Sequence, residues 1–266
     1  MERSDYAEAL KNVREKRPLV HHITNYVTVN DCANITMCIG GAPVMADAID
    51  EVEEMVRLAG ALVLNIGTLN NGQVESMMKA GKMAERLSVP IVLDPVGVGA
   101  TSMRTEVAKR LIAELKIAVL KGNAGEIGIL AGTGGVVRGV DSIGSKGDPA
   151  VVAMDLARSI GGTVVISGAT DVISDGKRTR LVDNGHAMMG TISGTGCMAA
   201  SVIGAFVAAN PDRVTAATAA MVSIGVAGEK AAMNAAGPGS FKVALLDETA
   251  GLSPDEVARS AKVREG

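Results

Sequence analysis

Short apolar runs alternate with longer amphipathic stretches along the first two thirds of the chain. The runs carry hydrophobic side chains at consecutive positions, a pattern typical of strands that are buried on both faces. They comprise residues 19–23, 62–66, 91–94, 117–120 and 163–166. Between them, apolar residues recur at three- and four-residue spacing, which predicts helices with one buried side. These helices are expected at residues 51–59, 72–87, 105–115 and 149–160.

This alternation of strands and helices predicts a mostly parallel central sheet covered by helices on both faces. A parallel connection needs a crossover, and the crossover helix packs on a face of the sheet. The expected fold class is therefore α/β, with a three-layer α/β/α sandwich. Ligands of such sheets bind near the carboxyl ends of the strands. No linker rich in Pro, Gly or Ser divides the sequence, so we expect residues 1–266 to form a single domain.

The pattern changes after residue 167. Residues 171–182 predict two short strands around an Asp-Gly turn, as a hairpin at the edge of the sheet. Small and apolar residues run almost unbroken from 196 to 235, which predicts two tightly packed helices. The segment 132–148 is rich in glycine and charged residues, so we expect a mobile loop there.

Composition narrows the class of partner. With 47% hydrophobic residues in 266, the chain can fill a large core, and no apolar stretch is long enough to cross a membrane. A net charge of −3, with two Phe, two Tyr and no Trp, leaves neither a basic field nor stacking rings for nucleic acid. The polar, acid-containing residues 1–5 resemble no signal peptide. We therefore expect a cytoplasmic protein that binds neither nucleic acid nor a membrane.

Cysteine spacing indicates reduced thiols. Cys32, Cys38 and Cys197 are odd in number and contain no C-x-x-C pair. A disulfide framework or a structural zinc site would need more cysteines at characteristic spacing.

The segment Gly194-Thr195-Gly196-Cys197 combines two glycines with a nucleophilic side chain where a helix is predicted to begin. The N–H groups of a first helical turn are unpaired and carry partial positive charge, and glycine lets an anion approach them closely. We therefore predict an anion hole at Gly194, Thr195 and Gly196 that accepts a phosphate. The same field would lower the pKa of the Cys197 thiol, which would then accept a proton from a substrate hydroxyl.

Two other interpretations of this segment exist. In the first, the glycines merely cap a helix and Cys197 is a small buried apolar residue. In the second, Gly194, Gly196 and Ala199 form the dinucleotide fingerprint G-x-G-x-x-A. That fingerprint belongs in the first strand-to-helix turn of a doubly wound domain. Here it falls late in the chain and is followed by helix, so we reject it.

Charged residues follow two of the predicted strands. Asp94 ends the third strand, and Lys121 and Glu126 come after the fourth. Mg²⁺ is commonly held by one or two carboxylates together with substrate phosphates, so Asp94 and Glu126 are candidate ligands, directly or through water. Lys121 would neutralise phosphate oxygens. Alternatively, Asp94 caps the next turn and Glu126 is a solvated residue of a first helical turn.

No Walker A sequence G-x-x-x-x-G-K-[ST] occurs in the chain. A protein that uses ATP without this sequence does not cradle the phosphates in a P-loop. If the chain binds ATP, it therefore needs a different kinase scaffold.

The amino-terminal segment 21–34 passes from strand to helix and is dense in amides and hydroxyls. Asn25 would bind a polar ligand or cap the helix. His21 and His22 are adjacent on a strand and point to opposite faces, so we expect structural roles for them instead of a shared metal. Met45, at the end of a Gly-Gly-Ala-Pro-Val run, would face a soft apolar ring or fill the core.

Six segments, in this order, resemble the hydroxyethylthiazole kinase family. They are V-H-H-I-T-N-Y-V-T-V-N-D-C-A-N, G-G-A-P-V-M, L-N-I-G-T-L, V-L-D-P-V-G-V-G-A-T, K-G-N-A-G-E-I and I-S-G-T-G-C-M. The resemblance covers nearly the full chain and implies a ribokinase-like fold. It also implies Mg²⁺-dependent transfer of the ATP γ-phosphoryl group to the alcohol of 4-methyl-5-(2-hydroxyethyl)thiazole, a step of thiamine salvage. The implied assembly is a homotrimer with active sites at the subunit interfaces.

The resemblance implies a thiazole site formed by Met45 and Gly194, with Asn25 and Gly67 close by. It places Cys197 where the catalytic base is expected. A thiol of ordinary pKa is a weak base at neutral pH, and general-base assistance is one contribution among several. Cys197 is therefore expected to assist transfer without being indispensable.

The resemblance also implies that Lys121 and Ser167 contact ATP and that Asp94 and Glu126 attend Mg²⁺. Arginine is commoner than lysine at the position of Lys121, and threonine is commoner than serine at that of Ser167. Lysine keeps the charge but loses the bidentate fork of arginine. We therefore expect a changed nucleotide affinity and an unchanged reaction class.

Three other functions remain open. Another ribokinase-like kinase would act on a hydroxymethylpyrimidine, pyridoxal or a sugar, and the region of Met45 and Asn25 would discriminate it. A lyase on the same scaffold, such as an ATP-dependent dehydratase for hydrated nicotinamide nucleotides, would need a larger second pocket. A binding protein that has lost phosphoryl transfer is disfavoured because Cys197, Asp94 and Glu126 are all present.

Overall fold

The computed structural model describes residues 3–133, 135–138, 141–145 and 147–266. The strands are β1 Leu19–Ile23, β2 Ala42–Met45, β3 Ala61–Asn65, β4 Ile91–Asp94, β5 Ile117–Asn123, β6 Gly135–Arg138, β7 Asp141–Ser145, β8 Thr163–Ser167, β9 Asp171–Ser174, β10 Thr179–Val182 and β11 Val263–Glu265. The helices are α1 Arg3–Lys16, α2 Val29–Ile39, α3 Val52–Leu58, α4 Asn71–Leu87, α5 Ser102–Glu114, α6 Ala124–Leu130, α7 Pro149–Ile160, α8 Thr195–Ala209, α9 Arg213–Asn234, α10 Pro238–Gly251 and α11 Pro254–Ser260, with a short 3₁₀ helix at Ala187–Thr191.

The central sheet has nine strands in the order β11-β10-β9-β8-β5-β4-β3-β1-β2. Strands β2, β1, β3, β4, β5 and β8 pair in parallel with one another, whereas the pairs β8–β9, β9–β10 and β10–β11 are antiparallel. The prediction of a mostly parallel sheet is confirmed. Each of the five predicted strands is present, with its ends within three residues of the prediction.

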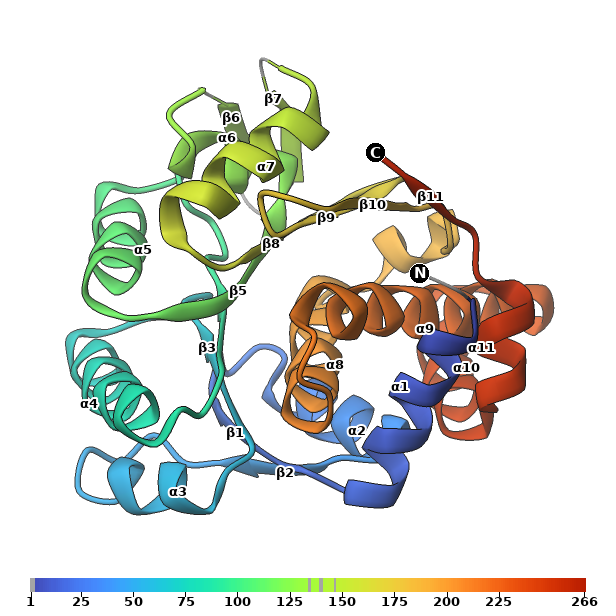
Figure 1. Cartoon of the computed structure of the whole chain (residues 1–266), viewed down its shortest axis with the longest axis horizontal. Coiled ribbons are helices and arrows are strands. Elements are labelled where there is room, and N and C mark those ends of the chain that lie inside the picture. Colours follow the sequence, from blue (N-terminus) through green and yellow to red (C-terminus); the bar gives the residue numbers. More distant parts are fainter. Residues whose placement is uncertain (1–2, 134, 139–140, 146) are drawn as a thin grey trace.

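Helices cover both faces of this sheet, as Figure 1 shows. Helices α3, α4, α5, α6 and α7 lie on one face; α2, α8 and α9 lie on the other, with α1, α10 and α11 packed against them. Adjacent strand residues divide between the two cores: Val63 packs with α8 and α9, and Leu62 and Leu64 pack with α4. The three-layer sandwich is therefore confirmed, while the prediction of a single domain over 1–266 stays a prediction.

Capping residues set where several helices begin. Thr101 accepts a hydrogen bond from the N–H of Arg104, so α5 begins at Ser102, three residues before the predicted start. Asn70 accepts from the N–H of Gln73 and begins α4 at Asn71 in the same way. Both are N-cap residue types with a strong preference for that position. Apolar spacing alone cannot locate such starts, because the cap precedes the first buried residue.

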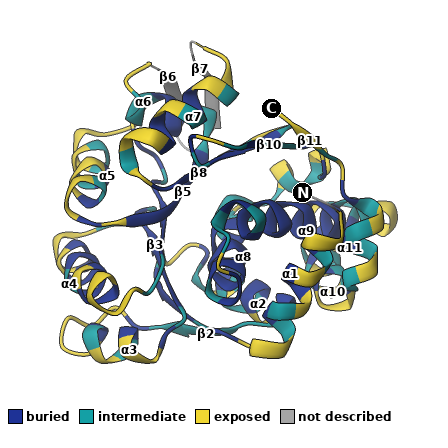
Figure 2. Cartoon of the chain, viewed as in Figure 1, coloured by how far each residue is buried: buried dark blue, intermediate teal, exposed yellow. Residues whose placement is uncertain are grey.

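The predicted helices near the carboxyl end are confirmed as α8 and α9. Their close approach to the sheet depends on small residues: a Cβ on Gly204 of α8 would lie 2.7 Å from Cγ2 of Val63. Figure 2 shows both helices almost continuously buried. Helix α8 packs against β1, β3 and β4, which brings its amino end over the carboxyl ends of these strands. None of the helices in the described part of the chain combines the length and apolar character needed to span a bilayer.

Two expectations about the segments beside the core need correction. The segment 132–148 contains the antiparallel pair β6 and β7, so it is not a loop throughout. Positions 134, 139–140 and 146 lie outside the described residues, and the mobility of the segment stays a prediction. The hairpin β9–β10 is confirmed, but it is not the edge of the sheet, because β11 pairs with the outer side of β10. Strand β11 is three residues long, too short for a periodic signal.

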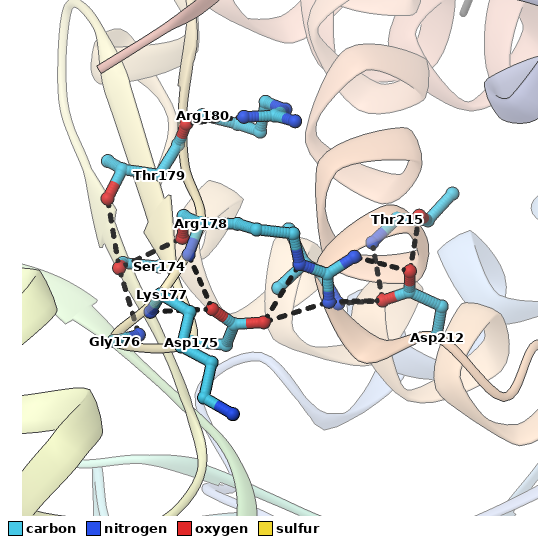
Figure 3. A network of polar contacts seen from close by, with 10 residues as sticks. Ser174, Asp175, Gly176, Lys177, Arg178, Thr179, Arg180, Asp212 and Thr215 are labelled. Carbon is cyan, nitrogen blue, oxygen red and sulfur yellow. Dashed lines mark hydrogen bonds and ion pairs between the residues drawn. The ribbon is translucent and has the colours of Figure 1, made fainter. Parts of the chain in front are cut away.

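Arg178 joins the β9–β10 turn to the start of α9. Its guanidinium donates to Asp175 Oδ2 from Nε at 3.0 Å and Nη2 at 2.8 Å, and to the carboxylate of Asp212 from Nη1 at 2.7 Å and Nη2 at 3.0 Å (Figure 3). Asp212 also caps α9, because it accepts from the N–H of Val214 at 3.1 Å. The antiparallel end of the sheet is thereby anchored to the helix layer.

Candidate active site

Three polar residues lie side by side on neighbouring strands. Asn65 ends β3 and pairs with Asp94, the last residue of β4, while Lys121 of β5 follows the residue paired with Leu93. They are only 2%, 1% and 3% exposed, respectively. Because strand residues alternate between faces, all three point to the face covered by α8. The strand ends therefore bring an amide, a carboxylate and an ammonium together beneath the amino end of α8.

Asn65 connects several groups of this site. Its Nδ2 donates to Asp94 Oδ2 at 3.0 Å and to the Sγ of Cys197 at 3.2 Å. Its Oδ1 accepts from the N–H of Gly67 at 2.9 Å and from Nδ2 of Asn25 at 2.9 Å. A backbone N–H can only donate, so the bond from Gly67 fixes which end of the Asn65 amide is oxygen. The amide nitrogen is then held towards Asp94 and Cys197.

Asn25 is oriented by the same logic. Its Oδ1 accepts from the backbone N–H of Thr28 at 3.0 Å and from the Thr28 hydroxyl at 3.1 Å. Its Nδ2 consequently faces Asn65 and also donates to the Sγ of Cys197 at 3.4 Å. The sulfur of Cys197 thus accepts from two oriented amides. These contacts favour a polar role for Cys197 over that of an ordinary apolar core residue.

The predicted lowering of the Cys197 pKa is wrong. Burial raises the pKa of Cys197 because it removes water from the thiolate, and the carboxylate of Asp94 adds to the rise. Thr28, Lys121 and Asn65 oppose it without reversing it. The amino end of α8 does provide a favourable field, but desolvation outweighs the favourable contacts. Cys197 is therefore predominantly a thiol at neutral pH.

The predicted anion hole lies at the start of α8. Gly194 caps the helix with φ +95°, and a Cβ there would lie 2.5 Å from Cγ2 of Thr28. A Cβ on Gly196 would lie 3.0 Å from the Nζ of Lys121, so only glycine leaves room in front of the ammonium. The first-turn N–H groups have no acceptor within the helix. The hydroxyl of Thr195 donates to the carbonyl of Met189 at 3.0 Å, so only its backbone remains for an anion.

Lys121 has no direct hydrogen bond or ion pair among the residues that the structure describes. Burial opposes its charged form, but the carboxylates of Asp94 and Glu126 outweigh that effect, so the pKa of Lys121 lies above its usual value. Its ammonium is therefore charged. A buried cation beside free N–H groups is a suitable receptor for a phosphate.

The two acidic residues differ in how they are held. Burial raises the pKa of Asp94 to about 7, although Lys121 lowers it and Glu126 raises it further. Glu126 accepts from the N–H of Gly97 at 2.7 Å and of Asn123 at 2.9 Å, one at each oxygen. Glu126 forms a capping box at the start of α6 and is 4% exposed, so the expectation of a solvated residue is wrong. Asp94 points to Asn65 and has no capping bond to the next turn.

These carboxylates fit a divalent ion that keeps most of its water. Within the described ranges, no cluster of three or more His, Cys, Asp or Glu side chains forms a metal cage. Mg²⁺ needs no such cage, because one or two carboxylates together with substrate phosphates normally hold it. Each Glu126 oxygen uses one lone pair for a backbone N–H and retains another. Asp94 and Glu126 therefore suit Mg²⁺ in the company of a phosphate.

A cavity of about 630 Å³ adjoins the start of α8. Its lining combines polar residues from the ends of β5 and β8 and the start of β9 with the apolar residues Ala199, Met221 and Ile224. Ser167 lies in this lining and donates to the carbonyl of Gly122 at 3.3 Å. Burial raises the pKa of Asp171, also in the lining, to about 7. The cavity suits a ligand with one polar and one apolar end.

The remaining predicted residues lie at the same end of the sheet. Gly67 packs so closely on Asn25 that a Cβ would lie 2.9 Å from the Cβ of Asn25. Met45 ends β2 at the open edge of the sheet and is half-buried. The histidines serve the fold as expected: Nε2 of His21 lies 2.6 Å from the carbonyl of Ala46, and burial lowers the pKa of His22 to about 4.

Sequence reasoning missed Asn65, Thr28 and Asp171. Asn65 carried a usable signal, because it is a polar residue that interrupts an apolar strand near its carboxyl end, as Asp94 does. Thr28 and Asp171 carried none, since hydroxyls and acids beside strand ends usually serve turns.

The chain has a ribokinase-like α/β fold. A ribokinase-like superfamily protein from Enterococcus faecalis superposes with a TM-score of 0.68, at 12% identity and with 96% of each chain covered. At that identity the likeness concerns the fold alone.

A family model described as "Hydroxyethylthiazole kinase family" matches residues 10–255, and the chain belongs to this family. It is 66% identical over 255 residues to the hydroxyethylthiazole kinase of Methanocella arvoryzae, with 96% of each chain covered. The relative from Thermoanaerobacter pseudethanolicus is 57% identical, with 96% of this chain and 98% of the relative covered. The structure of the hydroxyethylthiazole kinase from Pyrococcus horikoshii superposes with a TM-score of 0.91, at 47% identity over 98% of each chain.

Proposed function

We propose that the protein transfers the γ-phosphoryl group of ATP to the hydroxyethyl alcohol of 4-methyl-5-(2-hydroxyethyl)thiazole, a step of thiamine salvage. Membership of the hydroxyethylthiazole kinase family supports the reaction and its substrate. The observation that carries the proposal is the buried ammonium of Lys121, which stands directly in front of Gly196 at the free amino end of α8. An ammonium and unpaired N–H groups at one point suit a migrating phosphoryl group.

In this proposal the backbone of Gly194, Thr195 and Gly196 forms the anion hole, and Lys121 neutralises the equatorial phosphoryl oxygens. Phosphoryl transfer passes through a loose transition state in which positioning and charge neutralisation provide most of the catalysis. The oxygen–phosphorus bond to the acceptor forms as the bond from the γ-phosphorus to the bridging oxygen of ADP breaks. The negative charge that develops on the phosphoryl oxygens is stabilised by Lys121 and by the backbone N–H groups of the anion hole, which are already in position.

Cys197 accepts the proton that leaves the acceptor hydroxyl. Its sulfur is held by the amides of Asn25 and Asn65, so it has a fixed position beside the anion hole. Because burial raises the pKa of Cys197, only a small fraction of molecules carries the thiolate at neutral pH. General-base assistance typically contributes about 10²–10⁴-fold, and a mostly protonated thiol contributes less than this range.

Asp94 and Glu126 would hold Mg²⁺ when ATP is bound. The ion would supply positive charge to the phosphate oxygens of ATP. The chain prepares for it by fixing Glu126 between two backbone N–H groups and Asp94 against the amide of Asn65. Asp94, with its pKa of about 7, would be fully ionised once a cation lies beside it.

The cavity of about 630 Å³ would receive the nucleotide. Its lining residues Met221 and Ile224 suit a purine base. Ser167 of the lining and Lys121, which lies in front of the lining residue Gly196, would contact the phosphates. The thiazole would lie on the other side of the anion hole, among Asn25, Gly67, Gly194 and Met45. A thioether and a sulfur-containing aromatic ring are a favourable apolar pair.

The proposed assembly is a homotrimer with active sites at the subunit interfaces, in the cytoplasm. Tyr26 and Val27, next to Asn25 in the chain, are 77% and 61% exposed, and Met37 on α2 is 62% exposed. Large apolar side chains exposed beside a substrate site support a second subunit that covers it. Strand β2 with Met45 is also left half-covered at the edge of the sheet.

A coupled ADP-release assay tests the proposed reaction. The purified protein is given ATP with the thiazole alcohol, hydroxymethylpyrimidine, pyridoxal or ribose, with and without Mg²⁺. We expect the thiazole alcohol to give the highest kcat/KM, and no turnover without a divalent ion. A preference for pyridoxal or hydroxymethylpyrimidine would replace the proposal by another kinase, and binding without turnover would indicate a protein that has lost transfer.

A further inference from the structure

Arg104, in the first turn of α5, reaches two loops that follow neighbouring strands. Its Nη2 donates to the carbonyl of Gly67, after β3, at 2.7 Å. Its Nη1 donates to the carbonyl of Val96, after β4, at 2.8 Å, and lies 3.4 Å from the carbonyl of Ile66. One planar guanidinium therefore bridges the loops β3–α4 and β4–α5.

The hydrogen bonds of Arg104 all go to backbone carbonyls, as those of Arg14 to Thr249 and Ala250 do. Within residues 3–133, 135–138, 141–145 and 147–266, Arg104 forms no ion pair. The guanidinium of Arg178 is instead directed at two carboxylates. Because the half-buried guanidinium of Arg104 donates to backbone carbonyls, it fixes the path of the backbone there.

The β4–α5 loop is folded tightly onto this guanidinium. Gly97 has φ +77°, and a Cβ there would lie 2.8 Å from Nη1 and 3.1 Å from Cδ of Arg104. A side chain at position 97 would therefore displace the arginine. The absence of a side chain at Gly97 lets the β4–α5 loop pack directly against Arg104 of α5.

Each bridged loop also donates a backbone N–H to a residue of the candidate site. The N–H of Gly67 donates to Oδ1 of Asn65 at 2.9 Å, and the N–H of Gly97 donates to Oε1 of Glu126 at 2.7 Å. The carbonyl of Val96, which Arg104 holds, belongs to the same peptide group as the N–H of Gly97 that donates to Glu126. The carbonyl of Gly67, which Arg104 also holds, belongs to the residue whose N–H donates to Asn65.

We propose that Arg104 is a positioning residue, which locks the β3–α4 and β4–α5 loops together so that their N–H groups hold Asn65 and Glu126 in place. Arg104 would thereby position both Asn65, which contacts Cys197, and Glu126, the proposed Mg²⁺ ligand, without touching a substrate. The roles of Asn65 and Glu126 in catalysis rest on the proposed function, whereas the bridge between the two loops does not. Lysine at this position would keep the charge and lose the two-directional fork.

Three variants test the bridge: Arg104→Met, Arg104→Lys and Arg110→Met. Arg110 is the matched control because it lies on the same helix, is exposed, and pairs with Glu114 at 2.8 Å. Hydrogen exchange is measured on the ligand-free proteins, in peptides that cover residues 66–68 and 96–99. Steady-state kinetics give KM for the thiazole alcohol and for ATP, and the Mg²⁺ concentration at half-maximal rate.

In Arg104→Met we expect the amides of Gly67 and Gly97 to exchange about tenfold faster than in Arg110→Met, because charge-assisted hydrogen bonds are lost. The KM for the thiazole alcohol and the half-saturating Mg²⁺ concentration should each rise about tenfold, since the groups they meet are displaced. The KM for ATP at saturating Mg²⁺ should change less than about twofold, because Lys121 and Ser167 belong to other strands. Arg104→Lys should fall between Arg104→Met and the wild type.

Equal exchange in Arg104→Met and Arg110→Met would overturn the bridge. Faster exchange with unchanged constants for thiazole alcohol and Mg²⁺ would overturn its positioning role. If Arg104→Met does not fold, the comparison of Arg104→Lys with Arg110→Met decides in its place. A wild-type protein inactive on the thiazole alcohol would defeat the proposed function, and the exchange of the ligand-free protein would still decide whether the bridge exists.

Discussion

Arg178 and Lys121 use positive charge in opposite ways. Arg178 lies at the amino-terminal side of the sheet with its side chain 41% exposed, between the carboxylates of Asp175 and Asp212 (Figure 3). Lys121 lies at the carboxyl-terminal side, 3% exposed, and contacts none of the described acids directly. Arg178 has its partners within the fold. Lys121 is charged because of acids that surround it at longer range.

This difference separates a structural contact from a binding group. A cation between two carboxylates at a surface joins two elements and contributes modestly, because water screens the pair. The lysine is buried as a residue, and its ammonium, which has no direct protein partner in the described chain, remains available to an anionic ligand. A cavity of about 660 Å³ is lined by Arg178, and one of about 630 Å³ is lined by Gly196, in front of which Lys121 lies. Cavity volume therefore does not distinguish the two residues. They differ in that Arg178 is paired with carboxylates and Lys121 has no direct partner among the described residues.

Replacing Lys121 by methionine should have the largest effect on activity. Removing one preorganised charge at a developing anion costs about 10²–10³-fold in rate, so we expect kcat/KM for ATP to fall by that factor. Arg178→Met serves as the control and should retain kcat/KM. Steady-state kinetics of both variants, with urea denaturation to verify folding, test the comparison directly. Equal activity in Lys121→Met and the wild type would remove the functional distinction between the two cations.

Filling the space in front of Lys121 should have nearly as large an effect. In Gly196→Val the new side chain begins 3.0 Å from the Lys121 ammonium and occupies the place of the phosphate. We expect kcat to fall about 10²-fold, the order that misplaced reacting groups produce. Gly239→Val is the matched control, because a Cβ at Gly239 meets no atom within 4 Å. An unchanged kcat in Gly196→Val would place the phosphate elsewhere.

Removing the thiol of Cys197 should slow turnover without abolishing it. Serine keeps a small polar group between the amides of Asn25 and Asn65 but is a weaker base. Because the thiol is mostly protonated, we expect kcat to fall about 10-fold, below the usual range for a general base. Cys38→Ser on α2 is the control. Complete inactivity of Cys197→Ser, with ATP still bound, would show that proton removal limits the reaction.

The smallest effect is expected for Arg178→Met on stability. The pair is more than one third exposed, so its loss should cost about 1 kcal/mol or less of unfolding free energy at pH 7. Hydrogen bonds from Arg178 hold the pKa of Asp212 below its usual value of 3.8. A carboxyl with a lowered folded-state pKa adds stability above its unfolded-state pKa and loses it as the pH falls through the folded-state pKa.

Urea denaturation of wild type and Arg178→Met at pH 7 and at pH 2 measures this pH dependence. The two proteins should differ at pH 7, and the difference should shrink at pH 2 as the folded-state carboxyl of Asp212 takes up its proton. A difference that persists unchanged at pH 2 would mean that Arg178 stabilises through packing of its stem instead of its charge.

Apolar periodicity was sufficient for the strands at the centre of the sheet and insufficient at its edges. Strands β1 and β4 begin and end as predicted, because a strand buried on both faces has to be apolar throughout. Strands β2 and β11 were missed because edge strands are short and half-exposed. The segment of β6 and β7 was expected to be a loop because its glycines and charges mask the pairing.

The sequence predicted most residues of the candidate site but not the hydrogen bonds that connect them. Asp94, Lys121, Glu126 and Cys197 were recognised from their places after strands and glycines, and the structure brings them together. Asn65 was missed although it contacts both Asp94 and Cys197. The role of an asparagine can be inferred only when its partners are known, because its side-chain amide can both donate and accept hydrogen bonds.

The sequence by itself determined the layers of the fold, the family and the residue types at the strand ends. These features depend on hydrophobic period and on local spacing, which are one-dimensional properties. Only the tertiary structure decided that Cys197 stays protonated, that Lys121 lacks a direct partner and that Arg104 bridges two loops. These features depend on distance and desolvation among residues far apart in the chain, and neither quantity can be read from spacing.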